Sequence, residues 1–178
     1  VVSSFNSNIV EDNHGKYKVL NLSSVDEYNR INLQKMEELR ADYEKIKDCL
    51  TKKGDVLIRQ SHPFTVLVID DEVDLIVPST FLIIRIENNN YDKGFIGWYL
   101  STKKIKNNFI KHQIGSTQPT INKKIVSTIE LPKVDIKKQL QISSLATLLI
   151  RRSKKINKLL EEVEKENELI TKLLVEKI

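Results

Sequence analysis

The spacing of hydrophobic residues changes twice in the first half of the chain. Residues 16–22 alternate apolar with polar, which predicts a short strand. Between residues 33 and 50 the apolar positions recur every three or four residues. This spacing predicts one amphipathic helix that ends near Gly54, with a stripe made of Leu33, Met36, Leu39, Tyr43, Ile46 and Leu50. Residues 55–86 form short runs rich in Val, Ile, Leu and Phe, which predict four strands. The pattern therefore indicates a β-rich region with a helix packed against it.

The polar breaks between these four runs predict turns. His62-Pro63 separates the first two runs, and residues 70–72 separate the second from the third. The acidic residues of the second break, together with Asp74, include enough carboxylates to suggest a divalent cation. Their place between two apolar strands favours a solvated hairpin tip instead.

A helical pattern returns in residues 92–115 and stops at Gly115. Its apolar residues lie largely along one side and are Phe95, Trp98, Tyr99, Ile105, Phe109 and Ile110. Residues 116–132 then predict a loop, a short helix and a strand-like exit into Pro132. Cys49 stands alone in an apolar pattern, which favours a buried structural thiol.

The last forty or so residues predict a single long helix. Asp135 occupies the N-cap position, and no glycine or proline follows Pro132. At about 1.5 Å per residue, such a helix is roughly 60 Å long. A heptad repeat runs along it: the a positions are Ile142, Leu149, Ile156, Val163 and Ile170, and the d positions are Leu145, Arg152, Leu159, Glu166 and Leu173. A helix lying on its own domain would explain the first two turns only, so the repeat predicts a coiled coil.

The two charged d positions indicate the orientation of the partner helix. In a parallel homodimer Arg152 would face Arg152 and Glu166 would face Glu166, which is costly inside a seam. In an antiparallel pair centred near Leu159, each Arg152 approaches the partner's Glu166. The sequence therefore predicts an antiparallel, two-fold symmetric homodimer. A different partner with matching charges would satisfy the same residues.

Charge is unevenly distributed along the chain. The net charge is +5, and residues 93–138 hold ten lysines against two acidic residues, whereas residues 1–92 have an acidic excess. A basic segment is typical of a protein that contacts the phosphates of a nucleic acid. Lysine-rich helix faces exposed to solvent would produce the same composition.

Motifs for catalysis are missing from the sequence. It has no glycine-rich phosphate cradle, its three histidines are scattered, and it has no cysteine pair for zinc. We therefore expect a non-catalytic protein without a metal or cofactor. No apolar run approaches the roughly 18 residues of a membrane span, and no secretory signal is evident, so we expect a soluble cytoplasmic protein.

Three stretches resemble a known family. KKGDVLIRQS, at residues 52–61, resembles the Gly-Asp element of the target recognition domains of type I restriction–modification specificity subunits. VPSTFLIIRI, at residues 77–86, resembles the strand that follows that element. Residues 97–142 are similar to the most recognisable stretch of the family: Gly115–Pro119 match a Gly-Ser-Thr-Gln-Pro loop, and Leu131, Pro132 and Gln139 match the exit into a long helix.

The resemblance implies an α+β fold in two parts. Residues 1–134 would form a DNA-reading target recognition domain, including the connecting loop 113–134, and residues 135–178 would form the helix of an antiparallel coiled coil. Family members usually have two such domains and two helices, read the two halves of a bipartite DNA site, and have no catalytic activity of their own. The implied partners are double-stranded DNA, a DNA methyltransferase subunit and, in the full complex, a translocating endonuclease subunit.

This chain has one domain and one helix, so it is either a half-subunit that pairs with itself or part of a longer protein. Self-pairing would produce an interrupted palindrome, with identical half-sites about one helical turn apart. An alternative is a scaffold protein whose coiled coil binds other proteins and whose domain does not bind DNA. A stand-alone nuclease has less support than either, because no run of residues has a nuclease arrangement.

Candidate DNA contacts are polar residues on predicted loops and helix faces. Arg59, Gln60, Ser61 and His62 follow the Gly-Asp strand, and Arg and Gln are suited to bidentate contacts with guanine and adenine. The alternative for Arg59 is an ion pair with an acidic neighbour. Ser79 and Thr80 either bind a phosphate or cap a turn. Candidate phosphate contacts are Lys103, Lys104, Lys106, Lys111, Lys123 and Lys124. We expect Gln118 and Pro119 to be structural.

Overall fold

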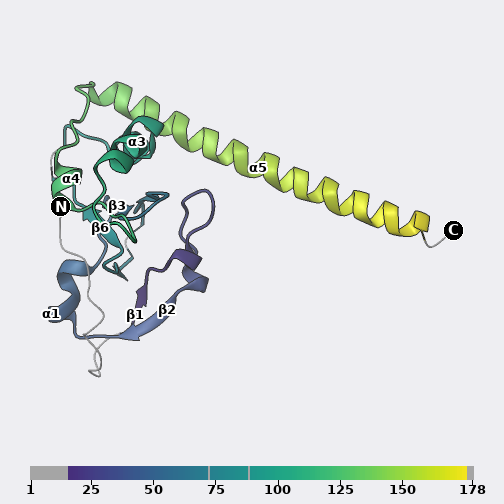
Figure 1. The fold of residues 1–178 in the computed structure, drawn as a ribbon, viewed down its shortest axis with the longest axis horizontal. Helices are drawn as coiled ribbons and strands as arrows, with labels where there is room; N and C mark the ends of the chain where they lie inside the picture. The colour runs from purple at the N-terminus through teal and green to yellow at the C-terminus, as the bar shows by residue number, and fades with distance from the viewer. Residues whose placement is uncertain (1–15, 72, 88, 176–178) are drawn as a thin grey trace. The chain divides into compact units, whose positions relative to one another are not determined.

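The computed structural model describes residues 16–71, 73–87 and 89–175 (Figure 1). The strands are β1 (Lys16–Val19), β2 (Glu37–Arg40), β3 (Val56–Arg59), β4 (Val66–Val68), β5 (Leu75–Ile76) and β6 (Phe81–Ile84). The helices are α1 (Tyr43–Ile46), α2 (Lys93–Ser101), α3 (Lys103–His112), α4 (Lys123–Ser127) and α5 (Ile136–Val175). Short 3-10 turns cover Leu22–Ser24, Leu33–Lys35 and Lys47–Cys49. The predicted α+β class is confirmed.

The central sheet has the order β4-β3-β6, and all its neighbours are antiparallel. Successive side chains of a strand point to opposite faces, and here both faces are buried. Val56 and Ile58 join a core shared with α2, α3 and α4, which we call the first core. Leu57 joins a second core with Phe81 and Ile83 of the neighbouring strand β6. Burial on both faces explains why these strands read as continuous apolar runs.

The second sheet has the order β2-β1-β5, in which β1 pairs antiparallel with β2 and parallel with β5. Strands β4 and β5 therefore belong to different sheets, and the hairpin predicted at residues 70–72 is wrong. Asp70 and Asp71 are exposed as expected, while Glu72 lies outside the described residues. A third core, formed by Ala41, Ile46, Cys49, Leu50 and Ile76, includes the buried thiol that the sequence indicated.

The long helix predicted between residues 33 and 50 is wrong. This stretch folds into a 3-10 turn, strand β2, the single-turn helix α1 and another 3-10 turn. Four backbone pairs join β2 to β1, from Lys16 with Arg40 to Val19 with Glu37. Met36 is buried in the second core and Ile46 in the third, so the apolar positions never formed a single stripe. Pairing between distant segments has overridden the local spacing.

The helix predicted over residues 92–115 is two helices that meet at Thr102. Its backbone is extended at φ −64° and ψ 147°, and its hydroxyl donates to the carbonyl oxygen of Tyr99 at 2.7 Å. A straight helix over residues 92–115 would extend about 36 Å, whereas a four-residue strand extends only about 13 Å. The break lets Phe95 of α2 and Phe109 of α3 enter the same first core. Trp98 and Ile110 remain exposed, against the expectation of one apolar side.

Close backbone approach fixes α2 on the central sheet. A Cβ atom at Gly97 would lie 2.4 Å from Cγ2 of Val68, so only glycine lets α2 pack this closely on β4.

The Gly-Asp element holds the start of β3 in place. Gly54 has φ +93°, a conformation that favours glycine. The side chain of Asp55 is 1% exposed and accepts two hydrogen bonds of 2.9 Å from the guanidinium of Arg85. Hydrogen bonding to this carboxylate raises the pKa of Arg85. The backbone N–H of Lys52 donates to the same carboxylate at 2.8 Å. The Gly-Asp element is therefore structural.

Gln139 attaches the first turn of α5 to the domain. It is fully buried, and its Oε1 accepts from the backbone N–H of Asp92 at 2.9 Å. Its Nε2 donates to the carbonyl oxygens of Asn90 and Val134. Asp135 caps the helix by accepting from the N–H of Lys138 at 3.0 Å, as the sequence predicted. The strand-like exit predicted at Pro132 is not a strand in the described structure.

Two compact units result, and they divide between Ser143 and Ser144. The first two turns of α5 belong to the unit that holds the sheets, and the same helix runs without a break to Val175.

Candidate nucleic-acid interface and helix seam

One end of the central sheet gathers six of the residues predicted to contact DNA. We call Arg59, Gln60, Ser61, His62, Ser79 and Thr80 the reading edge. The N–H of Gln60 donates to Thr80 at 2.9 Å, and its side-chain Nε2 donates to the carbonyl oxygen of Ser79 at 2.7 Å. Its own carbonyl oxygen accepts from the N–H of Ile121 at 2.8 Å. Gln60 therefore connects β3 both to the start of β6 and to the segment before α4.

One of the two N–H donors of the Gln60 amide is engaged within the fold. A bidentate contact with adenine requires both the oxygen and the nitrogen of the amide. While one N–H of Nε2 is bonded to Ser79, the second N–H and Oε1 remain for a base, but the bond restricts how the amide can turn. This residue is thus first a connector of the reading edge.

Arg59 is half-buried at the end of β3. None of the ion pairs formed by the described residues involves it, so the alternative of a surface salt bridge has no support. Its Nε is buried and has no hydrogen-bond partner among the described residues. A buried donor of this kind costs free energy unless an acceptor reaches it.

The His62-Pro63 turn is exposed at the same end of the sheet, as expected. Phe64, the next residue, is fully buried with φ +54°. Its ring lies 5.4 Å from the ring of Phe109 and 6.0 Å from that of His62, measured between centroids. The turn is therefore packed onto α3.

The predicted lysines are exposed on two helices, apart from the half-buried Lys106. Lys104 and Lys111 are seven residues apart, so they lie on nearly the same side of α3. Lys103 begins that helix and points to another side. Lys123 and Lys124 form the first turn of α4, and Asn122 caps this helix. The residue before the cap, Ile121, donates its backbone N–H to Gln60. Among the predicted lysines, Lys111, Lys123 and Lys124 are the nearest in sequence to Thr120 and Ile121, which pair with the reading edge.

Acidic residues lie at the opposite end of the central sheet. Val56 pairs with Val68, so the acidic connection that begins at Asp70 lies beside the start of β3. Arg59 pairs with Phe81 at the other end of the strand. Asp55 and Ser61 are six positions apart along extended chain, a distance of about 20 Å. This separation leaves the reading edge free of nearby carboxylates from that connection.

The heptad side chains of α5 are uncovered beyond the first turns. Of the ten predicted positions, Ile142 is partly buried in the first core. The seven other apolar positions are exposed, from 44% at Val163 to 60% at Leu159, and they are Leu145, Leu149, Ile156, Leu159, Val163, Ile170 and Leu173. Arg152 and Glu166 are exposed as well. A contiguous apolar patch of this length is typical of an interaction surface.

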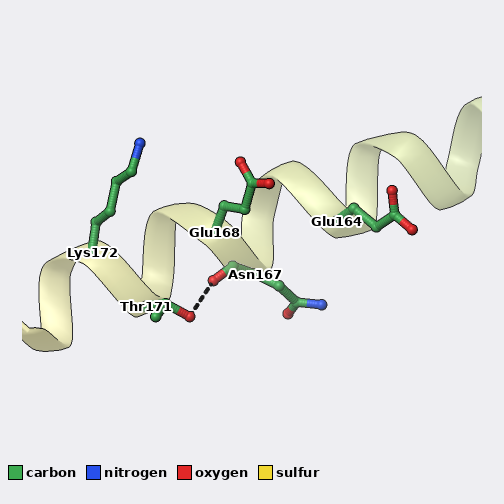
Figure 2. Close-up of a pocket in the computed structure, with 5 residues that line it drawn as sticks. All are labelled: Glu164, Asn167, Glu168, Thr171 and Lys172. Carbon is green, nitrogen blue, oxygen red and sulfur yellow. Dashed lines mark hydrogen bonds between the residues drawn. The ribbon is translucent and has the colours of Figure 1, made fainter.

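The opposite side of the helix is polar. A shallow groove there is lined by Glu164, Asn167, Glu168, Thr171 and Lys172 (Figure 2). All five residues belong to α5, and Figure 2 shows the polar ends of Glu164, Glu168 and Lys172 directed away from the ribbon. The hydroxyl of Thr171 donates to the carbonyl oxygen of Asn167 at 2.8 Å. This groove is the surface of one solvated helix face, with no residues converging on a ligand.

The described residues contain no group of three or more His, Cys, Asp and Glu side chains placed to hold a metal ion. Within the same residues, no helix is both long enough and apolar enough to cross a membrane.

One candidate surface was missed by the sequence analysis. Gly115, Ser116, Thr117 and Gln118 are exposed, and they form a loop beside the reading edge. We expected Gln118 to be structural, but its side chain has no hydrogen-bond partner in the described part of the chain. The signal in the sequence was the run of small polar residues after a glycine.

An α+β domain with a polar sheet edge, next to exposed lysines, is therefore joined to a helix that presents a long apolar seam. These features define a class of binding protein in which a polar, basic surface and an apolar helix face are the candidate interaction surfaces. The family model for the type I restriction modification DNA specificity domain matches residues 3–165, so the chain belongs to that family. The predicted family is confirmed.

Comparison with solved structures supports the same fold. A chain from a structure that describes complex assembly and conformational transition of the type I R-M system superposes with a TM-score of 0.66 at 17% identity. The match covers 88% of this chain and 41% of that chain, so this chain spans less than half the length of that relative. No curated protein matches the sequence.

Proposed function

We propose that this chain is the DNA-sequence-reading specificity subunit of a type I restriction–modification system, that it has no catalytic activity, and that it pairs with a second copy through α5. The observation that carries the proposal is the exposed seam of α5 with its two charged positions. A helix with seven exposed, heptad-spaced apolar residues is stabilised by a partner helix, because association removes that surface from water.

Symmetry favours a second copy as the partner. Arg152 and Glu166 each lie seven residues from Leu159, so a two-fold axis at Leu159 brings Arg152 to the height of the partner's Glu166. On that axis, the two copies of Ser143 are 32 residue rises apart, about 48 Å along the helix pair. A rigid pair of helices would thereby fix the distance between two identical domains, and hence the gap in a palindromic DNA site.

The reading edge supports direct recognition of bases. Arg59 has a buried Nε that an acceptor from outside the chain would satisfy, and guanine offers two acceptors in the major groove. Ser61 and His62 add exposed or half-exposed polar groups at the same end of β3. The exposed lysines of α3 and α4 supply phosphate contacts that carry no sequence information.

A methyltransferase is the proposed catalytic partner, since members of this family are DNA specificity domains of type I restriction modification systems. The solved relative belongs to a type I system described in terms of complex assembly. The translocating endonuclease of such a system is a further proposed partner. A cytoplasmic location follows from this role.

The decisive experiment is to co-express the chain with its DNA methyltransferase and to map methylated adenines in the host DNA. A symmetric motif with a fixed gap is the expected result. Methylation at random adenines, or at a motif without two-fold symmetry, would contradict the proposal. Arg59→Ala is the matched variant: it should relax or abolish the motif while the amount of folded protein stays the same.

The scaffold alternative predicts a different outcome in a simpler measurement. A specificity subunit binds duplex DNA with an affinity that falls steeply as salt rises. A scaffold protein would bind the methyltransferase or another protein and show no such DNA binding at any salt concentration.

A further inference from the structure

The loop formed by residues 115–118 is closed by its own backbone. Ile114 and Thr120 exchange two hydrogen bonds, of 2.8 and 2.9 Å, which join the two ends of the loop. Gly115 has φ +106°, and a Cβ atom there would lie 3.2 Å from the carbonyl oxygen of Gln118. The tight closure and the glycine conformation together give the loop a defined shape.

The loop has several hydrogen-bond donors that are not bonded to other described residues of the chain. The backbone N–H groups of residues 115–118 donate no hydrogen bond to the rest of the described chain. The hydroxyls of Ser116 and Thr117 and the amide of Gln118 also have no partner there, and all of these residues are exposed. Backbone N–H groups, small hydroxyls and amides are the groups, besides Lys and Arg, that proteins use to contact DNA phosphates.

The fold places this loop beside the reading edge. Thr120 pairs with Ser61 in a β-bridge, and the next residue, Ile121, donates to Gln60. Lys111 lies in the last turn of α3, just before the loop, and Lys123 and Lys124 follow it at the start of α4. The loop is thus adjacent to the proposed base-reading residues and lies between lysines on both sides of it along the chain.

We propose that residues 115–118 bind the phosphates of the DNA backbone and so position the reading edge against the bases, whatever the sequence of the DNA. This inference rests on the proposed DNA-binding function and adds a site to it. Two features of the loop argue for phosphate rather than base contacts. Its four backbone N–H groups are not used within the described fold and can donate to phosphate oxygens, and a loop held in one shape suits a backbone whose geometry is the same at every site.

The test compares Thr117→Glu with Thr117→Gln in the full-length chain. The two side chains have nearly the same size, but only glutamate places a negative charge beside a phosphate. Binding is measured by fluorescence anisotropy over a range of salt concentrations, with one duplex that carries the methylation motif and one that lacks it. Thr117→Glu should weaken binding to both duplexes by the same factor, roughly tenfold, and should lower the slope of log affinity against log salt by about one. Thr117→Gln replaces the hydroxyl by a neutral amide donor, so it should weaken binding much less than Thr117→Glu does and leave the salt slope unchanged.

Each other outcome overturns a distinct claim. If the wild type binds both duplexes and Thr117→Glu binds them equally well, the phosphate loop is refuted and the proposed function stands. If Thr117→Glu weakens binding to the motif duplex alone, the loop reads bases and the inference is again wrong. If the wild type binds neither duplex, even together with its methyltransferase, the proposed function itself fails. Because Thr117 is exposed, equal melting temperatures of the variants will show that the fold is intact.

Discussion

Reversing the charge at Arg152 tests whether two copies of α5 pair in antiparallel orientation. About an axis at Leu159, each Arg152 lies about 10.5 Å from the midpoint and meets the partner's Glu166 at the same height. A symmetric dimer contains this contact twice. Solvent-exposed ion pairs contribute roughly 0.2–1 kcal/mol each, and reversal replaces an attraction by a repulsion of similar size. Arg152→Glu should therefore destabilise the dimer by about 2 kcal/mol, which raises the dimer Kd roughly 30-fold.

Sedimentation equilibrium over a range of protein concentrations measures that Kd directly. The double variant Arg152→Glu with Glu166→Arg restores opposite charges and should return the Kd to within a few-fold of wild type. Lys172→Glu is the matched control, because it changes the net charge equally on the polar face shown in Figure 2. In a parallel dimer, position 152 of one chain faces position 152 of the other. Two arginines would then face each other in the wild type and two glutamates in the variant, so Arg152→Glu would hardly change the dimer Kd. Failure of the double variant to recover dimerisation would refute the antiparallel arrangement.

Four further outcomes are expected. Arg59→Ala should reduce the discrimination between motif and non-motif duplexes, measured by competition binding, by about 1–3 kcal/mol, and should leave the melting temperature unchanged. An equal loss of affinity for both duplexes would indicate that Arg59 contacts phosphates and does not read bases. Asp55→Asn should destabilise the fold by about 2–3 kcal/mol in urea denaturation, because it removes the charge that pairs with the part-buried Arg85; an unchanged midpoint would disprove this role. Gln139→Leu should destabilise the fold by about 3 kcal/mol, because it leaves one part-buried N–H and two carbonyl groups without their partner. Hydrogen exchange should show earlier opening of the first turns of α5, and unchanged exchange there would count against it. Burial, with a smaller contribution from Asp48, raises the pKa of the Cys49 thiol. Iodoacetamide at pH 8 should therefore alkylate this thiol far more slowly in the folded chain than in urea. Equal rates of alkylation, measured by mass spectrometry, would show that the thiol is accessible.

The spacing of apolar residues predicted an element correctly where all of that element lies in one kind of surroundings, either buried or exposed. The strands of the central sheet are buried on both faces, so their apolar runs were visible without any knowledge of their neighbours. The cap at Asp135 and the unbroken helix to Val175 followed from residues close together in the chain. The helix predicted over residues 33–50 was wrong because the apolar residues there lie in different cores. Their spacing of three or four residues arises by coincidence from a turn, a strand and a short helix.

Recognition of the reading edge was partial for a similar reason. Arg59 and Gln60 were found as neighbours in the sequence, but the bond between the Gln60 amide and Ser79 joins residues 19 positions apart. The 115–118 loop was recognised as a family motif but not as a possible DNA contact, because its unpaired donors and the pairing of nearby Thr120 with Ser61 are not visible in residue types.

By itself, the sequence determined the α+β class, the family, and the long helix with its heptad seam, because each depends on periodic or contiguous residues. Only the tertiary structure decided that the Gly-Asp element is a structural ion-pair site, that Gln139 anchors α5, and that Gln60 joins the reading edge to the loop before α4. The physical reason is the range of the interactions. Hydrophobic periodicity is a property of one segment, whereas a buried hydrogen bond needs a donor and an acceptor that the fold brings together from distant positions.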